Sequence, residues 1–245
     1  MAQKILTYKG AEFSLSYMIY NPQNREKSLV ILHGWGANKS LMQQAFKDTF
    51  KDYAHYYIDL PGFGNSKTPP FALNTHDYAK ILHLMLESLY LDSTKTTIMG
   101  HSFGGKVATL LNPKTLILLS SAGIPTQKSL KVRIKITIAK FLNKFLPALN
   151  RALRNLLRSK DVENMNEIMY QTFKNVVDED FSSVFQAFKN PCFIFWGKED
   201  LATPLHCGER IHALVSDSNF FVLSGDHFFF LKQAKEIEHK FHNSL

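Results

Sequence analysis

The sequence predicts an α/β fold built on a doubly wound, mostly parallel sheet. Short apolar runs bounded by Gly and Pro alternate with longer segments of helical spacing, which is typical of a sheet covered by helices on both faces. The 245 residues suffice for one large α/β domain or two small ones. The composition, 45% apolar and 20% charged, excludes disordered, collagen-like and disulfide-rich proteins.

Individual elements follow from local patterns. Ile5–Tyr8 and Glu12–Ile19 flank the Lys9-Gly10 turn and predict an antiparallel hairpin at one edge of the sheet. Asp77–Leu89 carries apolar residues at helical spacing and predicts a crossover helix. Six apolar runs predict the remaining strands: Ser28–His33, His55–Leu60, Thr96–Gly100, Lys114–Ser121, Pro191–Gly197 and Asn219–Ser224.

One interval, between Gly123 and Phe188, interrupts this alternation. Arg151–Leu157 and Val162–Val176 have helical spacing. Lys131–Ile138 alternates apolar and basic residues with period two, a strand pattern, but we predict helix there because its surroundings are helical. We therefore expect a core of residues 1–123 and 189–245, with a helical cap of residues 124–188. Such a cap would cover the carboxyl edge of the sheet, where α/β folds bind ligands.

The N-terminus has no apolar leader, and no stretch approaches the roughly 20 apolar residues of a membrane span. The chain has only two cysteines, Cys192 and Cys207, with no cluster of zinc ligands nearby in sequence. We expect a soluble cytoplasmic protein with no metal and no cofactor.

A candidate nucleophile lies in Gly100-His101-Ser102-Phe103-Gly104-Gly105, which fits the G-x-S-x-G pattern. An apolar strand precedes this motif and a helix-compatible segment, Lys106–Leu111, follows it. A sharp strand-to-helix turn needs small neighbours and presents the serine oxygen at a helix N-terminus. A Gly-rich packing turn is the alternative. Ser66 lacks the second glycine and follows a loop, so we interpret it as a loop cap.

A serine hydroxyl needs a base with a pKa near neutrality and a carboxylate that orients this base. His227 follows the last predicted strand, and Asp200 follows the strand before it. Glu199 is adjacent to Asp200 and stays an alternative, whereas we interpret Asp226 as a loop cap. The order Ser102, Asp200, His227 is that of G-x-S-x-G hydrolases.

Backbone N–H groups of Trp35 and Phe103 are the candidate oxyanion hole, because each follows a strand within a Gly-rich turn. The side chains of Trp35, Phe103 and Phe228 are candidates for an apolar substrate pocket beside Ser102. His33 and His101 flank glycine turns, where we expect them to support the site structurally.

Five motifs together resemble the α/β-hydrolase superfamily, and in particular its small, capped serine esterases. They are His33-Gly34-Trp35-Gly36, the loop from Asp59 to Ser66, the Ser102 motif, Trp196–Asp200 and Gly225–Phe228. The resemblance covers nearly the whole chain and implies about eight strands, a cap after the sixth, and the roles given above. Ser102 occupies the strand-to-helix turn at which epoxide hydrolases and haloalkane dehalogenases carry aspartate, and this serine argues against those reactions.

The resemblance implies hydrolysis of a carboxylic ester, thioester or lactone of small to medium acyl size through an acyl-enzyme on Ser102. Two alternatives stay open. The same fold could serve a C–C hydrolase, a lyase or a cofactor-free peroxidase, or the chain could be a non-catalytic binding protein. The presence of all three triad residues disfavours the second alternative.

The charge of +8 is uneven. Residues 126–160 contain no acidic residue and ten basic ones: Lys128, Lys131, Arg133, Lys135, Lys140, Lys144, Arg151, Arg154, Arg158 and Lys160. The rest of the chain carries 19 basic and 21 acidic residues. A solvated helical face would explain them. The resemblance includes methyl esterases that act on acyl groups held by a strongly acidic carrier protein, so such a carrier is a candidate partner. We expect neither nucleic-acid binding nor membrane contact.

Overall fold

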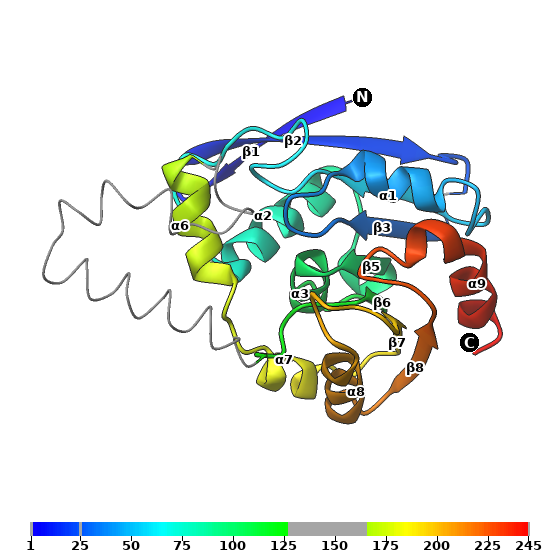
Figure 1. The fold of residues 1–245 in the computed structure, drawn as a ribbon. Coiled ribbons are helices and arrows are strands. Elements are labelled where there is room, and N and C mark those ends of the chain that lie inside the picture. Colours follow the sequence, from blue (N-terminus) through cyan, green and yellow to red (C-terminus); the bar gives the residue numbers. More distant parts are fainter. Residues whose placement is uncertain (1, 25, 127–165, 245) are drawn as a thin grey trace, which may run out of the picture.

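The computed structural model describes residues 2–24, 26–126 and 166–244, and these residues form an eight-stranded sheet flanked by helices (Figure 1). The strand order is β1-β2-β4-β3-β5-β6-β7-β8. β1 and β2 form an antiparallel hairpin, β2 pairs antiparallel with β4, and every later pairing is parallel. The predicted fold class, a mostly parallel sheet of about eight strands, is confirmed.

The elements lie close to their predicted positions. The strands are β1 Ala2–Tyr8, β2 Ala11–Tyr20, β3 Ser28–Leu32, β4 Ala54–Ile58, β5 Thr97–His101, β6 Thr115–Leu119, β7 Cys192–Gly197 and β8 Ser218–Leu223. The helices are α1 Lys39–Phe46, α2 Thr75–Ser88, α3 Phe103–Leu110, α6 Glu167–Val176, α7 Ser182–Ala187, α8 Leu205–Leu214 and α9 Phe230–His242.

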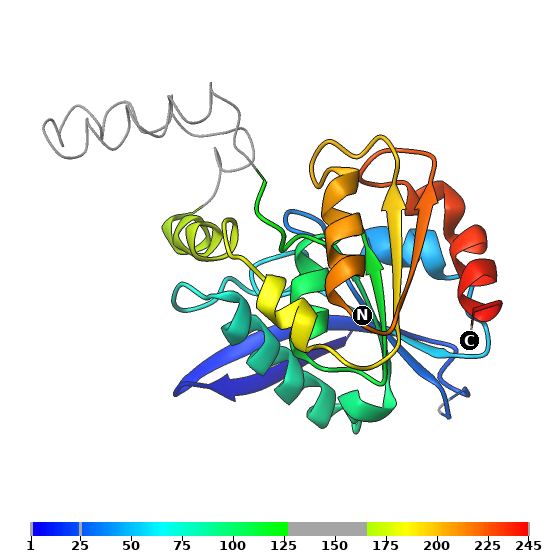
Figure 2. The same ribbon diagram turned by 90° about the horizontal axis from the view of Figure 1, so that it is seen from below.

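Helices cover both faces of the sheet, as Figure 2 shows. One apolar cluster joins alternate strand residues such as Val30 and Ile98 to α2, α3 and α8. A second cluster joins the intervening residues, such as Ile31 and Met99, to α1 and α9. Because side chains alternate across a strand, the continuous apolar runs in the sequence supply both layers of the core.

Local chemistry fixes the ends of several elements. Asn74 and Asp77 form a capping box at the start of α2, in which each side chain accepts the other residue's backbone N–H. Lys9 and Gly10 both have positive φ, +50° and +74°, which forms the tight turn between β1 and β2. The sequence predicts the Lys9-Gly10 turn but not the Asn74 cap, and the predicted helix begins two residues late, at Asp77.

The predicted cap of residues 124–188 lies mostly outside the described residues. The predicted segments 131–138 and 151–157 lie entirely outside them. Of this interval the structure describes 124–126 and the return to the core, in which α6 and α7 lie beside α2 and α3 (Figures 1 and 2). Among the described residues, no helix combines the length and apolar character needed to cross a membrane.

Candidate active site

Ser102 occupies a sharp turn between β5 and α3. Its φ of +51° and ψ of −115° lie in a region that L-residues rarely adopt. The turn depends on glycine: a Cβ at Gly100 would lie 2.4 Å from the carbonyl oxygen of Gly104. A Cβ at Gly104 would lie 2.5 Å from the carbonyl oxygen of His33. The close approach of these backbones explains why the motif needs small residues on both sides of the serine.

Backbone hydrogen bonds hold Ser102 in this conformation. Its N–H donates to the carbonyl of Leu119 at 3.1 Å, and its carbonyl accepts the N–H groups of Gly105 and Ala122, each at 3.0 Å. The strained turn is therefore anchored to the end of β6 as well as to the first turn of α3. This leaves the Ser102 side chain only partly buried, at the carboxyl edge of the sheet.

Asp200 and His227 come from the loops after β7 and β8 and are in direct contact. Nδ1 of His227 lies 2.7 Å from Oδ2 of Asp200, whose side chain is fully buried. The hydroxyl of Thr203 donates to the same oxygen at 2.9 Å, and the N–H groups of Ala202 and Thr203 donate to Oδ1. Burial alone would raise the pKa of Asp200, but hydrogen bonds from His227 and Thr203 outweigh it and lower the pKa to about 2.

The competing acidic residues face elsewhere. Glu199 accepts the N–H of Gly225, and Asp226 accepts the N–H of Phe228 at 2.8 Å. Each of them caps a loop, so neither makes the contact with the His227 ring that Asp200 makes. Ser66 is buried beneath its loop, where its hydroxyl donates to the carbonyl of Asp59 at 2.7 Å.

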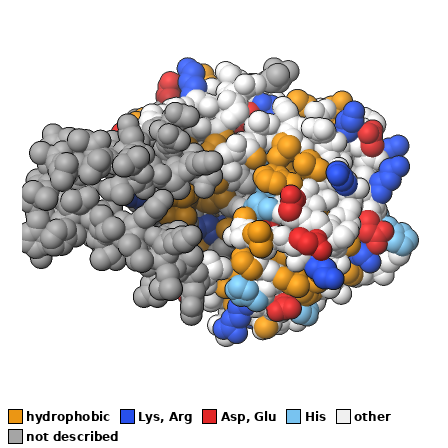
Figure 3. All heavy atoms as spheres, viewed as in Figure 1, with side chains coloured by type: hydrophobic (Ala, Val, Ile, Leu, Met, Phe, Trp, Pro, Cys, Tyr) orange, Lys and Arg blue, Asp and Glu red, His pale blue; other side chains and the backbone are white. Residues whose placement is uncertain are grey.

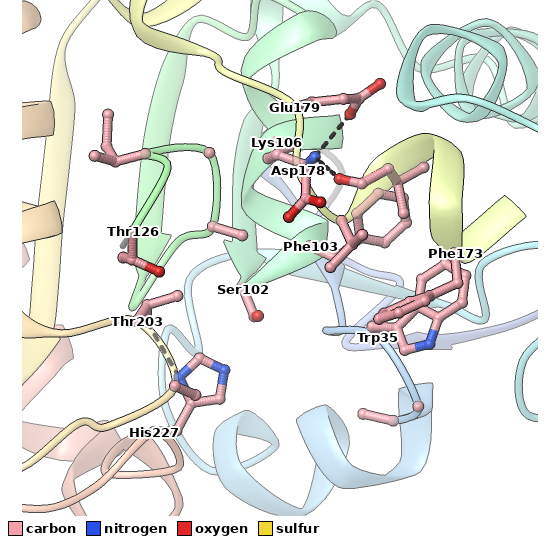
Figure 4. A pocket seen from close by; sticks show the side chains of 18 of the residues that line it. Trp35, Ser102, Phe103, Lys106, Thr126, Phe173, Asp178, Glu179, Thr203 and His227 are labelled. Carbon is pink, nitrogen blue, oxygen red and sulfur yellow. Dashed lines mark hydrogen bonds and ion pairs between the residues drawn. The ribbon is translucent and has the colours of Figure 1, made fainter. Parts of the chain in front are cut away.

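Ser102 and His227 line one cavity of about 1520 Å³. Figure 4 shows the Ser102 hydroxyl on the side of the imidazole away from Thr203, with the second ring nitrogen facing the same space. Asp200 lies behind the ring, held through Nδ1. The geometry therefore gathers a hydroxyl, an imidazole and a buried carboxylate from three loops at the carboxyl ends of the parallel strands.

The loop after β3 approaches Ser102 closely. A Cβ at Gly34 would lie 3.1 Å from the Cβ of Ser102, so glycine lets this loop reach the turn. Nδ1 of His33 lies 2.8 Å from the Gly34 carbonyl, and Nε2 of His33 accepts the N–H of Leu60 at 3.0 Å. In a trans peptide the carbonyl and the next N–H point in opposite directions. His33 thus fixes the plane of the peptide that carries the Trp35 N–H.

Aromatic side chains form much of the cavity wall. Trp35, Phe103 and Phe228, the predicted pocket residues, all line it. The Trp35 ring contacts Phe103 and Phe173 with centroids 5.5 and 5.3 Å apart. In Figure 3 hydrophobic side chains gather near the middle of the visible face, whereas basic and acidic side chains are interspersed over its right-hand half.

Several cavity residues were not predicted from the sequence. Phe173 and Val176 come from α6, a long way along the chain from Ser102. Thr203 follows Asp200 by three residues, a spacing at which side chain and backbone commonly hydrogen-bond, so a local signal existed. Lys106 and Glu179 gave no such signal, because only the fold brings them together.

The buried Lys106 and the partly buried Glu179 form an ion pair in the cavity wall. Nζ of Lys106 lies 2.7 Å from Glu179 and donates to the carbonyl of Val176 at 2.6 Å (Figure 4). Thr75 at the start of α2 also donates to Glu179. Burial lowers the pKa of Lys106, and Glu179 acts in the opposite direction. The pair joins α3, directly after Ser102, to the α6–α7 connection.

Comparisons with known proteins agree with this architecture. A model of the alpha/beta hydrolase family matches residues 29–239. The pimeloyl-[acyl-carrier protein] methyl ester esterase of Vibrio campbellii is 37% identical over 81 residues, which is 33% of this chain and only 29% of that relative. The enzyme of the same name from Shewanella woodyi is 25% identical over 209 residues, covering 73% of this chain and 77% of the relative.

A solved structure extends the likeness over the whole chain. An esterase from Exiguobacterium antarcticum covers 100% of this chain and 99% of its own, with a TM-score of 0.74 and 21% sequence identity. At this identity the likeness concerns the fold alone. The family match over most of the chain establishes the class: this chain belongs to the alpha/beta hydrolase family.

Proposed function

We propose that this protein is a serine hydrolase that cleaves carboxylic esters, including thioesters or lactones, through an acyl-enzyme on Ser102. The observation that carries this proposal is the 2.7 Å contact of the buried Asp200 with His227, which lines the same cavity as Ser102. A buried carboxylate fixes the tautomer and orientation of an imidazole, which the imidazole needs in order to act as a base.

The proposed reaction has two halves. His227 accepts the hydroxyl proton as Ser102 Oγ bonds to the acyl carbon, and the backbone N–H groups of Trp35 and Phe103 stabilise the oxyanion. The C–O bond to the alcohol then breaks, and His227 returns the proton to the departing alkoxide. Water repeats these steps on the acyl-enzyme and releases the acid. Asp200 stays ionised throughout, consistent with its low pKa of about 2.

The cavity supports an apolar acyl group of small to medium size. Its lining includes the aromatic side chains of Trp35, Phe103, Phe173 and Phe228. Ligand sites commonly have volumes of about 300–1,000 Å³, so this cavity does not restrict the substrate to acetate. A C–C hydrolase, lyase or peroxidase would use the same three side chains, and a substrate panel distinguishes these reactions.

The test of the nucleophile is Ser102→Ala. We expect turnover of p-nitrophenyl butyrate to fall by about 10⁴-fold or more, because the attacking oxygen is lost. Circular dichroism should not change. The loop serine Ser66 provides a matched variant, Ser66→Ala, which should keep most of the activity of the wild-type protein. Activity of Ser102→Ala within tenfold of wild type would refute the assignment.

We further propose that the natural ester is presented by an acidic carrier protein. Two relatives are named as esterases of acyl groups on an acyl carrier protein. The ten basic residues between 126 and 160, all of which lie outside the described part of the chain, supply a complementary charge. Opposite charge accelerates association and aligns partners more than it adds affinity.

A further inference from the structure

His101, directly before the nucleophile, contacts the backbone of His227. It is the last residue of β5 and is buried. Its Nε2 lies 3.0 Å from the carbonyl oxygen of His227. A carbonyl oxygen can only accept a hydrogen bond, so Nε2 carries the ring proton and donates it.

The rest of the His101 ring makes no polar contact. Its Nδ1 has no hydrogen-bond partner among the residues that the structure describes. The ring packs on the rings of His227 and Phe230, with centroids 4.6 and 4.7 Å apart. Burial, and secondarily the neighbouring His227, lower the pKa of His101 to about 3, so the ring is neutral at neutral pH. An unpaired buried acceptor destabilises the folded state, and an apolar side chain would avoid that cost.

The position of His101 separates it from the substrate. It is not among the described residues that line the cavity, so it can act only through the groups it touches. Asp200 holds the His227 side chain through Nδ1, and His101 holds the same residue through its carbonyl. Two independent hydrogen bonds therefore define both the backbone and the ring of His227.

We propose that His101 is a positioning residue: its Nε2–H fixes the backbone of His227 and so keeps the imidazole between Asp200 and Ser102. The inference rests on the proposed function, because it assigns a role in placing the proposed base. It explains why a polar ring with one unsatisfied nitrogen occupies this buried place.

The test compares two substitutions at this position. His101→Phe keeps an aromatic ring but removes the donor, and kcat for p-nitrophenyl butyrate should fall by about 10²-fold, the effect of misplacing a reacting group by about 1 Å. KM should stay unchanged, because His101 does not line the cavity. His101→Gln keeps an N–H donor near Nε2 and should restore kcat to within about tenfold of wild type, as one neutral hydrogen bond is retained.

His55 provides a matched control. It is also buried, and its Nε2 lies 2.9 Å from the carbonyl of Phe50, at the opposite end of the parallel strands from Ser102. His55→Phe should lower the melting temperature while kcat stays near the wild-type value. If His101→Phe and His55→Phe lose stability equally and both keep wild-type kcat, His101 is a packing residue and the inference is wrong.

Spectroscopy tests the inference without turnover. The ¹⁵N shifts of His101 in the wild-type protein should show a neutral ring protonated at Nε2, and the opposite tautomer would overturn the inference even if no variant folds. The low-field proton resonance of the His227–Asp200 hydrogen bond should persist in His101→Gln and broaden in His101→Phe. If the wild-type protein hydrolyses no ester, the proposed function fails, while these spectra still decide whether His101 holds His227.

Discussion

At the scale of single residues, buried neutral histidines organise the site. His33 fixes the Gly34 peptide, His101 contacts the His227 backbone, and both rings are fully buried. Desolvation is the largest cause that lowers the pKa of each, to about 4 for His33 and about 3 for His101. Protonation of Nε2 of His33 would break the hydrogen bond that it accepts from Leu60, and protonation of Nδ1 of His101 would place a charge on a buried nitrogen that has no partner among the described residues.

These shifts predict acid sensitivity of the fold. In the unfolded chain both histidines bind protons near pH 6.5, whereas in the folded protein they bind them only near pH 4 and pH 3. Between the folded pKa values and pH 6.5, the unfolded state therefore binds more protons than the folded state. The free energy of unfolding should fall as pH falls below about 6.5. Urea denaturation at a series of pH values from 7.5 to 4.5 measures this dependence.

Two variants test whether His33 contributes to this pH dependence of the free energy of unfolding. His33→Asn keeps a donor near Nδ1 but does not titrate in this range, so its free energy of unfolding should depend less steeply on pH. His83 is half exposed, with 52% of its side chain accessible, and His83→Gln should keep the wild-type slope. A wild-type free energy of unfolding that is constant between pH 7 and pH 5 would contradict the prediction.

At the scale of elements, the β5–α3 turn shows how the backbone presents a side chain. β3, β5 and the first turn of α3 approach so closely that Gly100 and Gly104 each face carbonyl groups. This contact holds Ser102 in its positive-φ conformation at the helix N-terminus. The helix dipole there favours the negative charge that we expect to develop on the substrate oxygen.

Gly100→Ala should therefore disrupt the turn. Its Cβ would meet the Gly104 carbonyl at 2.4 Å, and overpacking of this kind costs about 1–3 kcal/mol or more, with loss of esterase activity. Gly10→Ala is the comparison, because nothing lies within 4 Å of that Cβ and only its φ of +74° is unfavourable. It should cost about 1–2 kcal/mol and leave kcat unchanged. Thermal unfolding and p-nitrophenyl butyrate assays measure both, and equal kcat losses would contradict this account.

At the scale of the whole molecule, the charge is concentrated in one segment. The chain outside residues 126–160 carries 19 basic and 21 acidic residues, and the face in Figure 3 shows both signs mixed. The cavity is built jointly by the sheet edge and by the α6–α7 return, which the Lys106–Glu179 pair ties to α3. In the sequence, the first basic residue of this segment, Lys128, follows the cavity-lining residues Ile124–Thr126 almost directly. A partner that binds the basic segment would therefore bind a part of the chain adjacent in sequence to the cavity lining.

The carrier proposal predicts a salt effect that depends on the substrate. Raising salt from about 0.05 M to 0.5 M shortens the Debye length to a few ångströms, so kcat/KM for an ester on acyl carrier protein should fall by about tenfold or more. Hydrolysis of p-nitrophenyl butyrate, which is neutral, should change little. Steady-state assays at both salt concentrations measure this difference.

Charge reversal locates the effect. Replacing Arg151, Arg154 and Arg158 with Glu should weaken turnover of the carrier-bound ester and remove most of its salt dependence. Replacing the exposed Lys47, Lys51 and Lys235 with Glu changes the net charge equally and should have a much smaller effect. Equal effects of the two triple variants would exclude a localised carrier site.

Much of the fold and the candidate triad followed from local patterns. Strand limits differ from prediction by only one or two residues at most ends, because buried parallel strands need uninterrupted apolar runs bounded by turn residues. Ser102, Asp200 and His227 were candidates because each follows such a run. The ion pair of Lys106 with Glu179 and the packing of Phe173 on Trp35 could not be predicted, since 73 and 138 residues separate the partners.

The sequence by itself determined which residue types follow each strand, and hence that a serine, a carboxylate and a histidine lie at the same edge of a parallel sheet. That edge is a consequence of chain direction: parallel strands place their carboxyl ends together. Tertiary packing decided the choice of Asp200 over Glu199, the contact of His101 with His227 and the walls of the cavity. These depend on the distance and orientation of side chains from different elements, which no local periodicity encodes.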